Sequence, residues 1–206
     1  MSKTILIIAA LCLIFSCGLS VAADVNPESG IVQSYSGNLS EKDIKDIAFY
    51  SMYGLFGPIG MSAGEMVKFN APKPGWKLKN VGIFAYDGFN GTPESVPPDN
   101  SISLEVRDKD LNLLYRYADS EIPFSNFRLN ITDPMFMNFE VPSIPVSDEF
   151  YVVFYDRGAL VVASELNVTA NSYIFDRTAR KPIPAVVPIG VNRTAPVNWI
   201  MVLEGS

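Results

Sequence analysis

Apolar and polar residues alternate strictly over residues 101–107 (SISLEVR), where every second residue is apolar. This alternation is typical of a β-strand, because a strand places successive side chains on opposite faces. A polar run from Asp108 to Asp110 interrupts it, and alternation resumes at Leu113, Tyr115 and Tyr117, with Arg116 facing the other way. The pattern predicts a β-hairpin that seeds an antiparallel sheet with one face toward water.

Further short strands are expected wherever alternating or β-rich runs recur along the chain. The run Glu149–Tyr155 is apolar on both faces, which is typical of a central strand covered on both sides. A change of parity at Val81 predicts either a bulge within residues 76–85 or two strands that meet at a bend there. The remaining strands are expected at residues 46–53, 65–70, 135–141, 159–164, 172–176 and 198–204.

Glycine and proline mark the expected connections. The glycine-rich residues 54–64, the polar residues 87–100 and the proline-bearing residues 121–134 are predicted to be loops. Residues 177–197 contain four prolines and are expected to form a long loop or a segment that covers a sheet edge. About ten short strands without a long helix predict an all-β, antiparallel two-sheet sandwich of jelly-roll type.

The N-terminal residues have the pattern of a secretory signal peptide. Lys3 precedes the uncharged apolar run Ile5–Phe15, and small residues end at Ala23 before Asp24. We therefore expect a signal-peptide helix over residues 1–23 with cleavage after Ala23. A retained N-terminal anchor and lipoprotein processing at Cys17 are the alternatives. Residues 24–45 are predicted to be a linker or short helix, and residues 46–206 the sandwich domain.

Composition narrows the function classes. The chain has 206 residues, 16 basic and 22 acidic side chains, a net charge of −6 and no histidine. The acidic balance argues against nucleic-acid binding, which requires a basic face. The absence of histidine excludes Ser-His-Asp triads, Cys-His pairs and histidine-bearing zinc sites. Both cysteines, Cys12 and Cys17, lie in the predicted signal peptide, so the exported chain is expected to have no disulfides.

Five Asn-x-Ser/Thr motifs, none with proline in the middle, are candidate glycan acceptors in an exported chain. Chance occurrence in a chain rich in Asn, Ser and Thr is the alternative. The five asparagines are Asn38, Asn90, Asn130, Asn167 and Asn192.

No metal site is predicted, although calcium is an alternative at two places. The run Asp108-x-Asp110-x-Asn112 resembles the start of a calcium loop, but Leu113 and Asp119 replace the glycine and glutamate that an EF-hand needs. A hairpin turn explains these residues without metal. Asp87 and Asp99 form the second possible pair.

Two further hypotheses concern sugars. Exposed aromatic rings can stack on sugar rings, and the candidates are Phe89, Trp76, Phe124 and Trp199. Core packing is the alternative, and it is favoured for Trp76 and Trp199, which lie on apolar strand faces, whereas Phe89 lies in a polar loop. Paired carboxylates can hydrolyse a glycoside, and the nearest pattern is Glu105-x-x-Asp108-x-Asp110, which runs off the strand into the turn. We predict no catalytic residues.

Three parts of the chain carry a resemblance to a known family. They are WKLKNVGIFAYDG at Trp76–Gly88, the hairpin Ile102–Tyr115 together with Phe139–Asp156, and NWIMVLEG at Asn198–Gly205. Together they resemble jelly-roll modules of archaeal, especially methanogen, and bacterial cell-surface proteins. Such modules are similar to galactose-binding-like and pre-peptidase C-terminal domains. The resemblance covers roughly residues 46–205 and implies a non-catalytic appendage.

The expected function is a non-catalytic, exported structural or adhesion module, secreted or at the cell surface. It would contact a cell-surface protein or glycan through its loops, and a membrane only through a retained signal peptide. A carbohydrate-binding module is the alternative, and a carboxylate-dependent glycoside hydrolase is the third hypothesis.

Overall fold

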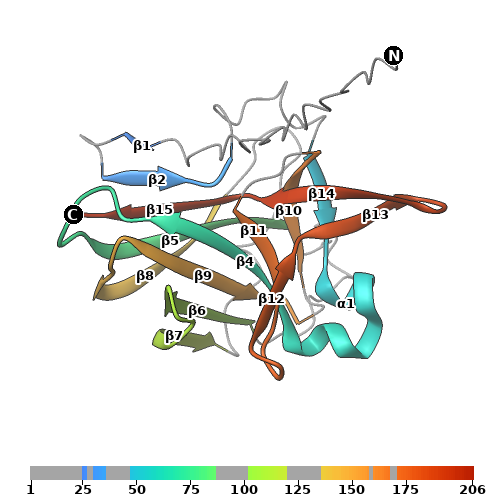
Figure 1. Ribbon diagram of the computed structural model, residues 1–206, viewed down its shortest axis with the longest axis horizontal. Coiled ribbons are helices and arrows are strands. Elements are labelled where there is room, and N and C mark those ends of the chain that lie inside the picture. The colour runs from blue at the N-terminus through green and yellow to red at the C-terminus, as the bar shows by residue number, and fades with distance from the viewer. Residues whose placement is uncertain are drawn as a thin grey trace, which may run out of the picture.

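Two antiparallel β-sheets packed face to face form the body of the molecule in the computed structural model (Figure 1). The structure describes residues 25–26, 30–35, 47–86, 102–119, 136–157, 160–167 and 171–206. The all-β, two-sheet prediction is confirmed. The predicted signal peptide, residues 1–23, lies outside the described residues, as do most of residues 24–45 and the predicted loop 87–100.

The larger sheet has nine strands in the order β1-β2-β15-β5-β10-β14-β13, and in addition β3 pairs with β10 and β8 pairs with β5. Its strands are β1 (Val25–Asn26), β2 (Ile31–Gln33), β3 (Ile47–Tyr50), β5 (Lys77–Tyr86), β8 (Phe136–Pro145), β10 (Val161–Leu166), β13 (Val186–Gly190), β14 (Arg193–Trp199) and β15 (Met201–Gly205).

The smaller sheet has six strands in the order β12-β11-β4-β9-β6-β7. Its strands are β4 (Ala63–Asn70), β6 (Ile102–Asp108), β7 (Leu113–Asp119), β9 (Glu149–Tyr155), β11 (Ser172–Asp176) and β12 (Lys181–Pro184). The predicted hairpin is confirmed as β6 and β7, and β9 lies between β4 and β6, as its two apolar faces predicted.

Eight of these strands pair as one antiparallel ribbon folded across both sheets. The hairpin β6·β7 is its tip, and the pairs β5·β8, β4·β9 and β3·β10 follow in turn toward its base. Successive pairs lie alternately in the six-stranded and the nine-stranded sheet. Because each pair brings the next one together, the ribbon places residues that are distant in sequence on neighbouring strands.

The core lies between the sheets and is built from the apolar positions that the alternation predicts. Val67, Leu104 and Phe154 of the six-stranded sheet are fully buried, as are Val81 and Ile83 of β5. The predicted parity change in β5 is confirmed, because its register with β8 shifts between Leu78 and Asn80. This bulge lets both halves of β5 direct apolar residues inward.

The predicted first strand is confirmed over Ile47–Tyr50, but its last residues and most of the predicted glycine-rich loop are helical, so the predictions for these residues are wrong. The strand β3 ends at Tyr50, and α1 (Met52–Phe56) and the 3-10 helix η2 (Gly57–Ser62) follow. Ser51 caps α1 by accepting a hydrogen bond from the Gly54 N–H at 2.9 Å. Gly60 fits because a Cβ there would lie 2.1 Å from the Met52 carbonyl oxygen. The absence of a side chain at Gly60 therefore permits η2 to pack closely on α1.

Prolines end fewer strands than expected. Residues 177–197 contain β12, β13 and most of β14 instead of a long loop, and β8 continues through Pro142. Proline is tolerated where the backbone N–H faces away from a partner strand, as at an edge such as β12 or β13. The predicted last strand, Asn198–Glu204, is divided at Ile200 between β14 and β15.

The predicted boundary between linker and domain is wrong for residues 31–33. These residues form β2, which pairs with β15, so the nine-stranded sheet includes residues that precede position 46. Within the described residues, no helix has the length and apolar character needed to cross a bilayer.

Candidate functional site

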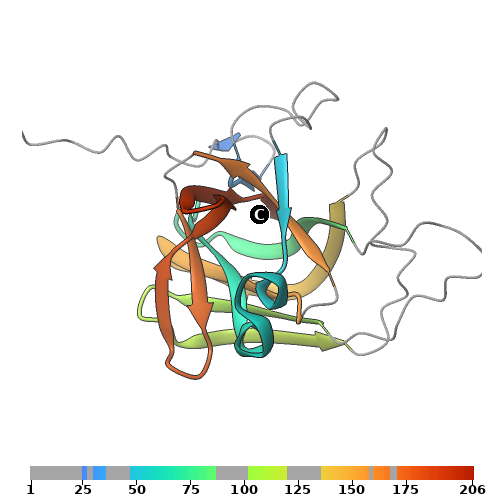
Figure 2. The same cartoon turned by 90° about the vertical axis from the view of Figure 1, so that its right-hand side faces the viewer.

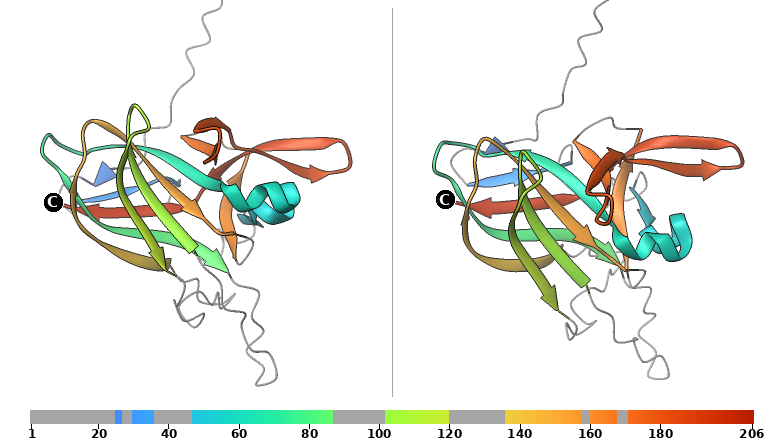
Figure 3. Two further views of the ribbon diagram at one scale, coloured as in Figure 1. Left: turned by 90° about the horizontal axis from the view of Figure 1, so that it is seen from below. Right: turned by 60° about the horizontal axis from the view of Figure 1, so that its bottom comes forward.

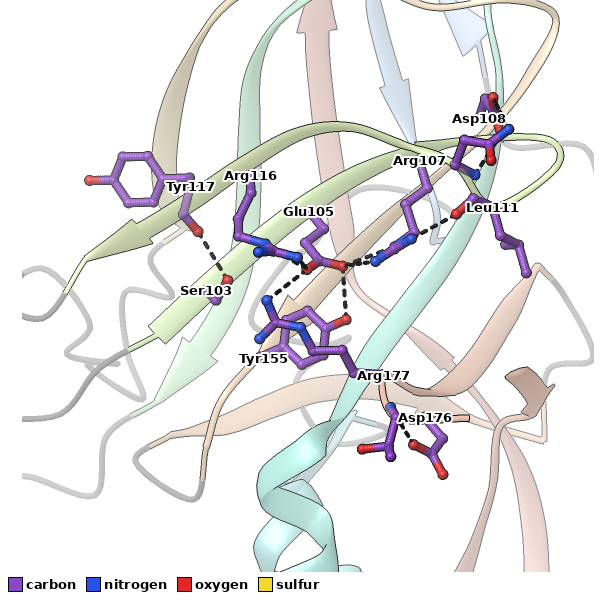
Figure 4. Close-up of polar contacts among 12 residues, drawn as sticks. Ser103, Glu105, Arg107, Asp108, Leu111, Arg116, Tyr117, Tyr155, Asp176 and Arg177 are labelled. Atoms are coloured by element: carbon purple, nitrogen blue, oxygen red, sulfur yellow. Dashed lines mark hydrogen bonds and ion pairs between the residues drawn. The ribbon is translucent and has the colours of Figure 1, made fainter. Parts of the chain in front are cut away.

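On β6, the side of the hairpin that was predicted to face water is covered, whereas Arg116 on β7 is exposed, and this side carries a cluster of charges. Ser103, Glu105 and Arg107 of β6 are all buried, although they alternate with the core residues and point away from the core. We call Glu105, Arg107, Arg116, Arg177 and Tyr155 the arginine cluster (Figure 4). It lies on the outer face of the six-stranded sheet.

Strand register brings most of the cluster together. Glu105 pairs with Arg116 of β7 on one side and with Val153 of β9 on the other. Tyr155 lies two residues beyond Val153 and therefore shares its face. Arg177 lies in the turn that follows β11, so its position in the cluster depends on the pairing of β11 with β4.

Both oxygens of the Glu105 carboxylate are occupied. Arg107 donates to Oε2 from Nε at 2.9 Å and from Nη2 at 2.6 Å, and the Tyr155 hydroxyl donates to the same oxygen at 2.9 Å. Arg116 donates to Oε1 from Nε at 2.9 Å and from Nη2 at 2.8 Å, and Nη2 of Arg177 lies 3.1 Å from Oε1. Charge-assisted hydrogen bonds of this kind are the strongest that side chains make.

Aromatic rings hold two of the arginines in place. The guanidinium of Arg107 lies over the ring of Phe175, 4.9 Å from its centroid, and that of Arg177 lies over Tyr155 at 5.1 Å. Arg107 also donates from Nη1 to the Leu111 carbonyl oxygen at 2.7 Å. The β6–β7 turn is thereby tied to the outer face of the sheet.

Glu105 is ionised in this environment. Burial alone would raise its pKa, but the hydrogen bonds from Arg107 and Tyr155 and the charges of Arg107 and Arg177 outweigh burial, so the pKa lies below its ordinary value. Burial and the neighbouring Glu105 carboxylate raise the pKa of Tyr155, so its hydroxyl keeps its proton. The cluster therefore combines one negative charge with three positive ones.

The surplus positive charge reaches the surface through two arginines. The Glu105 and Arg107 side chains are 0% and 6% exposed, whereas Arg116 is 42% and Arg177 is 29% exposed. The nearby carboxylates of Asp108 and Asp176 are taken up by their own turns, where each accepts backbone N–H groups. A guanidinium group has five N–H donors in a planar fork, so the N–H groups of Arg116 and Arg177 that face solvent can bind an anionic group.

Tyrosines extend this face of the sheet. Tyr151 pairs directly with Arg107, and Tyr173 pairs with Met66 on the far side of β4. The two half-buried rings meet edge to face, with centroids 6.3 Å apart. Arginine edges and tyrosine rings therefore lie along one side of the same sheet.

A second buried glutamate points the opposite way, into the space between the sheets. Glu65 of β4 and Asp156, which follows β9, are both 0% exposed. Neither carboxyl oxygen of Glu65 has a hydrogen-bond donor among the described residues, while Asp156 accepts the Met52 N–H at 2.8 Å. Burial, and then the charge of Asp156, raise the pKa of Glu65 well above its ordinary value. The pKa of Glu65 is thus raised where that of Glu105 is lowered.

The predicted aromatic platform loses one member. Trp76 is fully buried and its ring packs 6.1 Å from that of Phe150, so it is not available to a sugar at the surface, and the prediction for Trp76 is wrong. Trp199 is also fully buried and donates from its indole N–H to the Tyr173 carbonyl oxygen at 3.0 Å. Phe89 and Phe124 lie outside the described residues.

Two of the predicted glycan acceptors have accessible positions. Asn167 and Asn192 are exposed in turns, and both have positive φ angles, of 61° and 57°. Asn38, Asn90 and Asn130 lie outside the described residues, as does the proposed cleavage position after Ala23. Turn positions leave an asparagine side chain accessible to a modifying enzyme.

The Asp108 carboxylate holds the hairpin turn, as the turn interpretation predicted. It accepts the N–H groups of Asp110 and Asn112 at 2.9 and 2.8 Å, and the Asn112 side-chain amide at 3.0 Å. No group of three or more metal-ligating side chains occurs in the described part of the chain. Asp87 and Asp99 lie outside that part.

Sequence reasoning placed Glu105, Arg107 and Arg116 on one face but missed the cluster. The alternating pattern is the same whether a polar face meets water or is covered. A signal was available in the hairpin, since its register places Arg116 opposite Glu105. Nothing in the local sequence indicates that Tyr155 and Arg177 join them.

Searches against protein families, curated proteins and solved structures found no match to this chain.

Proposed function

We propose that the chain is an exported, non-catalytic β-sandwich that works as a cell-surface adhesion module and binds an acidic glycan. The observation that carries the proposal is the arginine cluster, in which three guanidinium groups surround a single carboxylate. Its exposed members, Arg116 and Arg177, offer N–H donors to a carboxylate or sulfate group. The contact surface proposed here is the outer face of a sheet, whereas the sequence alone pointed to loops.

We further propose that the sandwich is of jelly-roll type, in line with the resemblance to cell-surface modules. The support is the ribbon formed by the pairs β6·β7, β5·β8, β4·β9 and β3·β10. Rolling such a ribbon produces the sheet orders β3-β10-β5-β8 and β4-β9-β6-β7, which occur here. Strands from both ends of the chain, β1, β2 and β13–β15, extend the nine-stranded sheet, and β11 and β12 extend the six-stranded sheet.

Binding explains the charged groups of this face better than hydrolysis does. A glycosidase needs one carboxyl group that can donate a proton and a second that is free to attack or to activate water. Glu105 accepts from four side-chain groups and has a lowered pKa, and Asp108 is engaged in its turn. The inner pair, Glu65 and Asp156, is fully buried. These observations favour a non-catalytic module.

An acidic glycan fits the mixed character of the face. Planar guanidinium groups bind carboxylates and sulfates through paired hydrogen bonds, and tyrosine rings pack on the apolar side of sugar rings. Arg116 supplies the guanidinium group, and the half-buried Tyr151 and Tyr173 supply the tyrosine rings. Export with cleavage after Ala23, and a glycan on Asn167, belong to the same proposal of a cell-surface glycoprotein.

A glycan array tests the proposal directly. The chain purified after export is probed against neutral glycans and against glycans that carry uronic acid, sialic acid or sulfate. We expect binding to acidic glycans, reduced by about tenfold in Arg116→Gln, since a charged hydrogen-bond pair contributes roughly 1.4 kcal/mol or more. A thermal melt of the variant verifies that it is folded.

Arg193→Gln is the matched control, because Arg193 is an exposed arginine on β14, away from the cluster. This variant should bind acidic glycans as the parent chain does. Equal losses in the two variants would indicate a general charge effect and contradict the proposed site. Binding only to neutral sugars, or to no sugar at all, would contradict acidic-glycan recognition.

A further inference from the structure

Two protrusions extend from one end of the sandwich. They are the helical segment α1–η2 and the hairpin β13–β14, which face the viewer together in Figure 2 and project to the same side in both views of Figure 3. They are far apart in sequence, at residues 52–62 and 186–199. Their shared position makes this end a composite surface.

Exposed apolar side chains concentrate on these two protrusions. Among the described residues, nine large apolar side chains are exposed, and six of them lie here. Ile59 of η2 is 76% exposed and Val191, at the tip of the hairpin, is 91% exposed. We call these six the apolar end: Tyr53, Phe56, Ile59, Met61, Val186 and Val191. Single exposed apolar residues are ordinary, but a concentration of them marks an interaction site.

Neither protrusion contains an acidic residue. No charged residue occurs from Ile47 to Gly64. Residues 177–203 contain four cations and no acidic residue, in a chain whose net charge is −6. Three of these cations are exposed, namely Arg180, Lys181 and Arg193. The preceding residue, Asp176, has its carboxylate turned to the N–H groups of Thr178 and Ala179.

We propose that the apolar end docks on an anionic lipid surface. Apolar side chains gain free energy when they enter the boundary between headgroups and acyl chains, and tyrosine is favoured at that depth. Lysine and arginine close to an anionic leaflet add attraction that falls off within a Debye length. A fluid surface can receive two separate projections at once, which a rigid partner could do only with a matching shape.

Docking places one condition on the hairpin. Asn192 adjoins Val191 at its tip and is one of the predicted glycan acceptors. A glycan there would hold the tip away from the lipid, so docking requires an unmodified Asn192. The apolar end shares no side chain with the arginine cluster, although the Arg177 N–H donates to the Ser62 carbonyl oxygen at the end of η2 at 3.1 Å.

Vesicle co-sedimentation tests the inference. The exported chain with Asn192→Gln is mixed with two kinds of vesicle. One contains only phosphatidylcholine, and the other contains equal parts of phosphatidylcholine and phosphatidylglycerol. We expect binding to the mixed vesicles that weakens in high salt. The double variant Ile59→Glu/Val191→Glu should lower the partition coefficient by about tenfold or more, because it places charges at the two most exposed apolar positions.

The matched control is Leu113→Glu/Leu114→Glu on β7, where two leucines are 43% and 42% exposed. This control should keep the partition coefficient within about twofold of that of the chain without it, since these two leucines lie on a different element from the apolar end. Equal losses in the two double variants would overturn the inference. So would the absence of vesicle binding, equal binding to neutral vesicles, or self-association in sedimentation velocity that the apolar-end variant abolishes.

Discussion

Glu105 and Glu65 are fully buried glutamates on strands of the same sheet, yet their pKa values are shifted in opposite directions. Glu105 lies on the outer face of β6, where Arg107, Arg116, Arg177 and Tyr155 hold it ionised. Glu65 lies on the inner face of β4 beside Asp156, where burial and a like charge raise its pKa well above the ordinary value. The comparison shows that burial alone does not determine the ionisation of a carboxyl group; its partners do.

The largest expected effect comes from removing the charge that holds the cluster together. Glu105→Gln leaves three guanidinium groups without an anion, two of them at least partly buried, and should lower the free energy of unfolding by about 3–5 kcal/mol. Urea denaturation at pH 7 measures the loss. Glu140→Gln is the matched control, since Glu140 is an exposed glutamate on β8.

The pH dependence of this loss follows from the lowered pKa. The stability that Glu105 contributes is present above its ordinary pKa and disappears as the pH falls through its lowered value. The difference between Glu105→Gln and the parent chain should therefore shrink in acid. A loss no larger than that of Glu140→Gln would show that the arginine cluster does not stabilise the sheet.

A smaller effect of opposite sign is expected at the other glutamate. A protonated Glu65 contributes stability that is present below its ordinary pKa of about 4.3 and is lost as the pH rises through its raised pKa. Glu65→Gln, which is neutral at every pH, should therefore be more stable than the parent by about 1–3 kcal/mol at pH 8. Thermal melts from pH 4 to pH 9 should show the gap opening as the pH rises. Parallel curves for the two proteins would indicate an ionised Glu65.

The local pattern of apolar and polar residues predicted the strands that face the core, because the apolar residues that alternate along a strand are the ones that the core buries. The hairpin β6–β7, the central strand β9 and the bulge in β5 follow directly from the spacing of apolar residues. The glycine-rich residues 54–64 and the prolines of 177–197 were misinterpreted. In the first, Gly60 allows two helices to pack, and in the second three of the four prolines, Pro182, Pro184 and Pro188, occupy the edge strands β12 and β13.

The arginine cluster shows where such reasoning stops. Glu105, Arg107 and Arg116 could be assigned to one face from the hairpin alone. Whether that face meets water depends on Tyr155 and Arg177, which arrive from β9 and from the turn after β11. Burial of a polar face is therefore a property of the assembled sheet order, which no single segment encodes.

The folded ribbon also bears on how the chain reaches its native state. The tip, β6·β7, closes over a few residues, whereas Tyr50 and Val162 at the base of the ribbon are far apart in sequence. Loop closure costs entropy that grows with separation, so each pair that forms near the tip shortens the next closure. We expect assembly to proceed from tip to base, with amides of β6 and β7 protected before those of β3 and β10 in pulse-labelled hydrogen exchange. Simultaneous protection would mean that the strands condense together, and the fold would then gain no kinetic benefit from its winding.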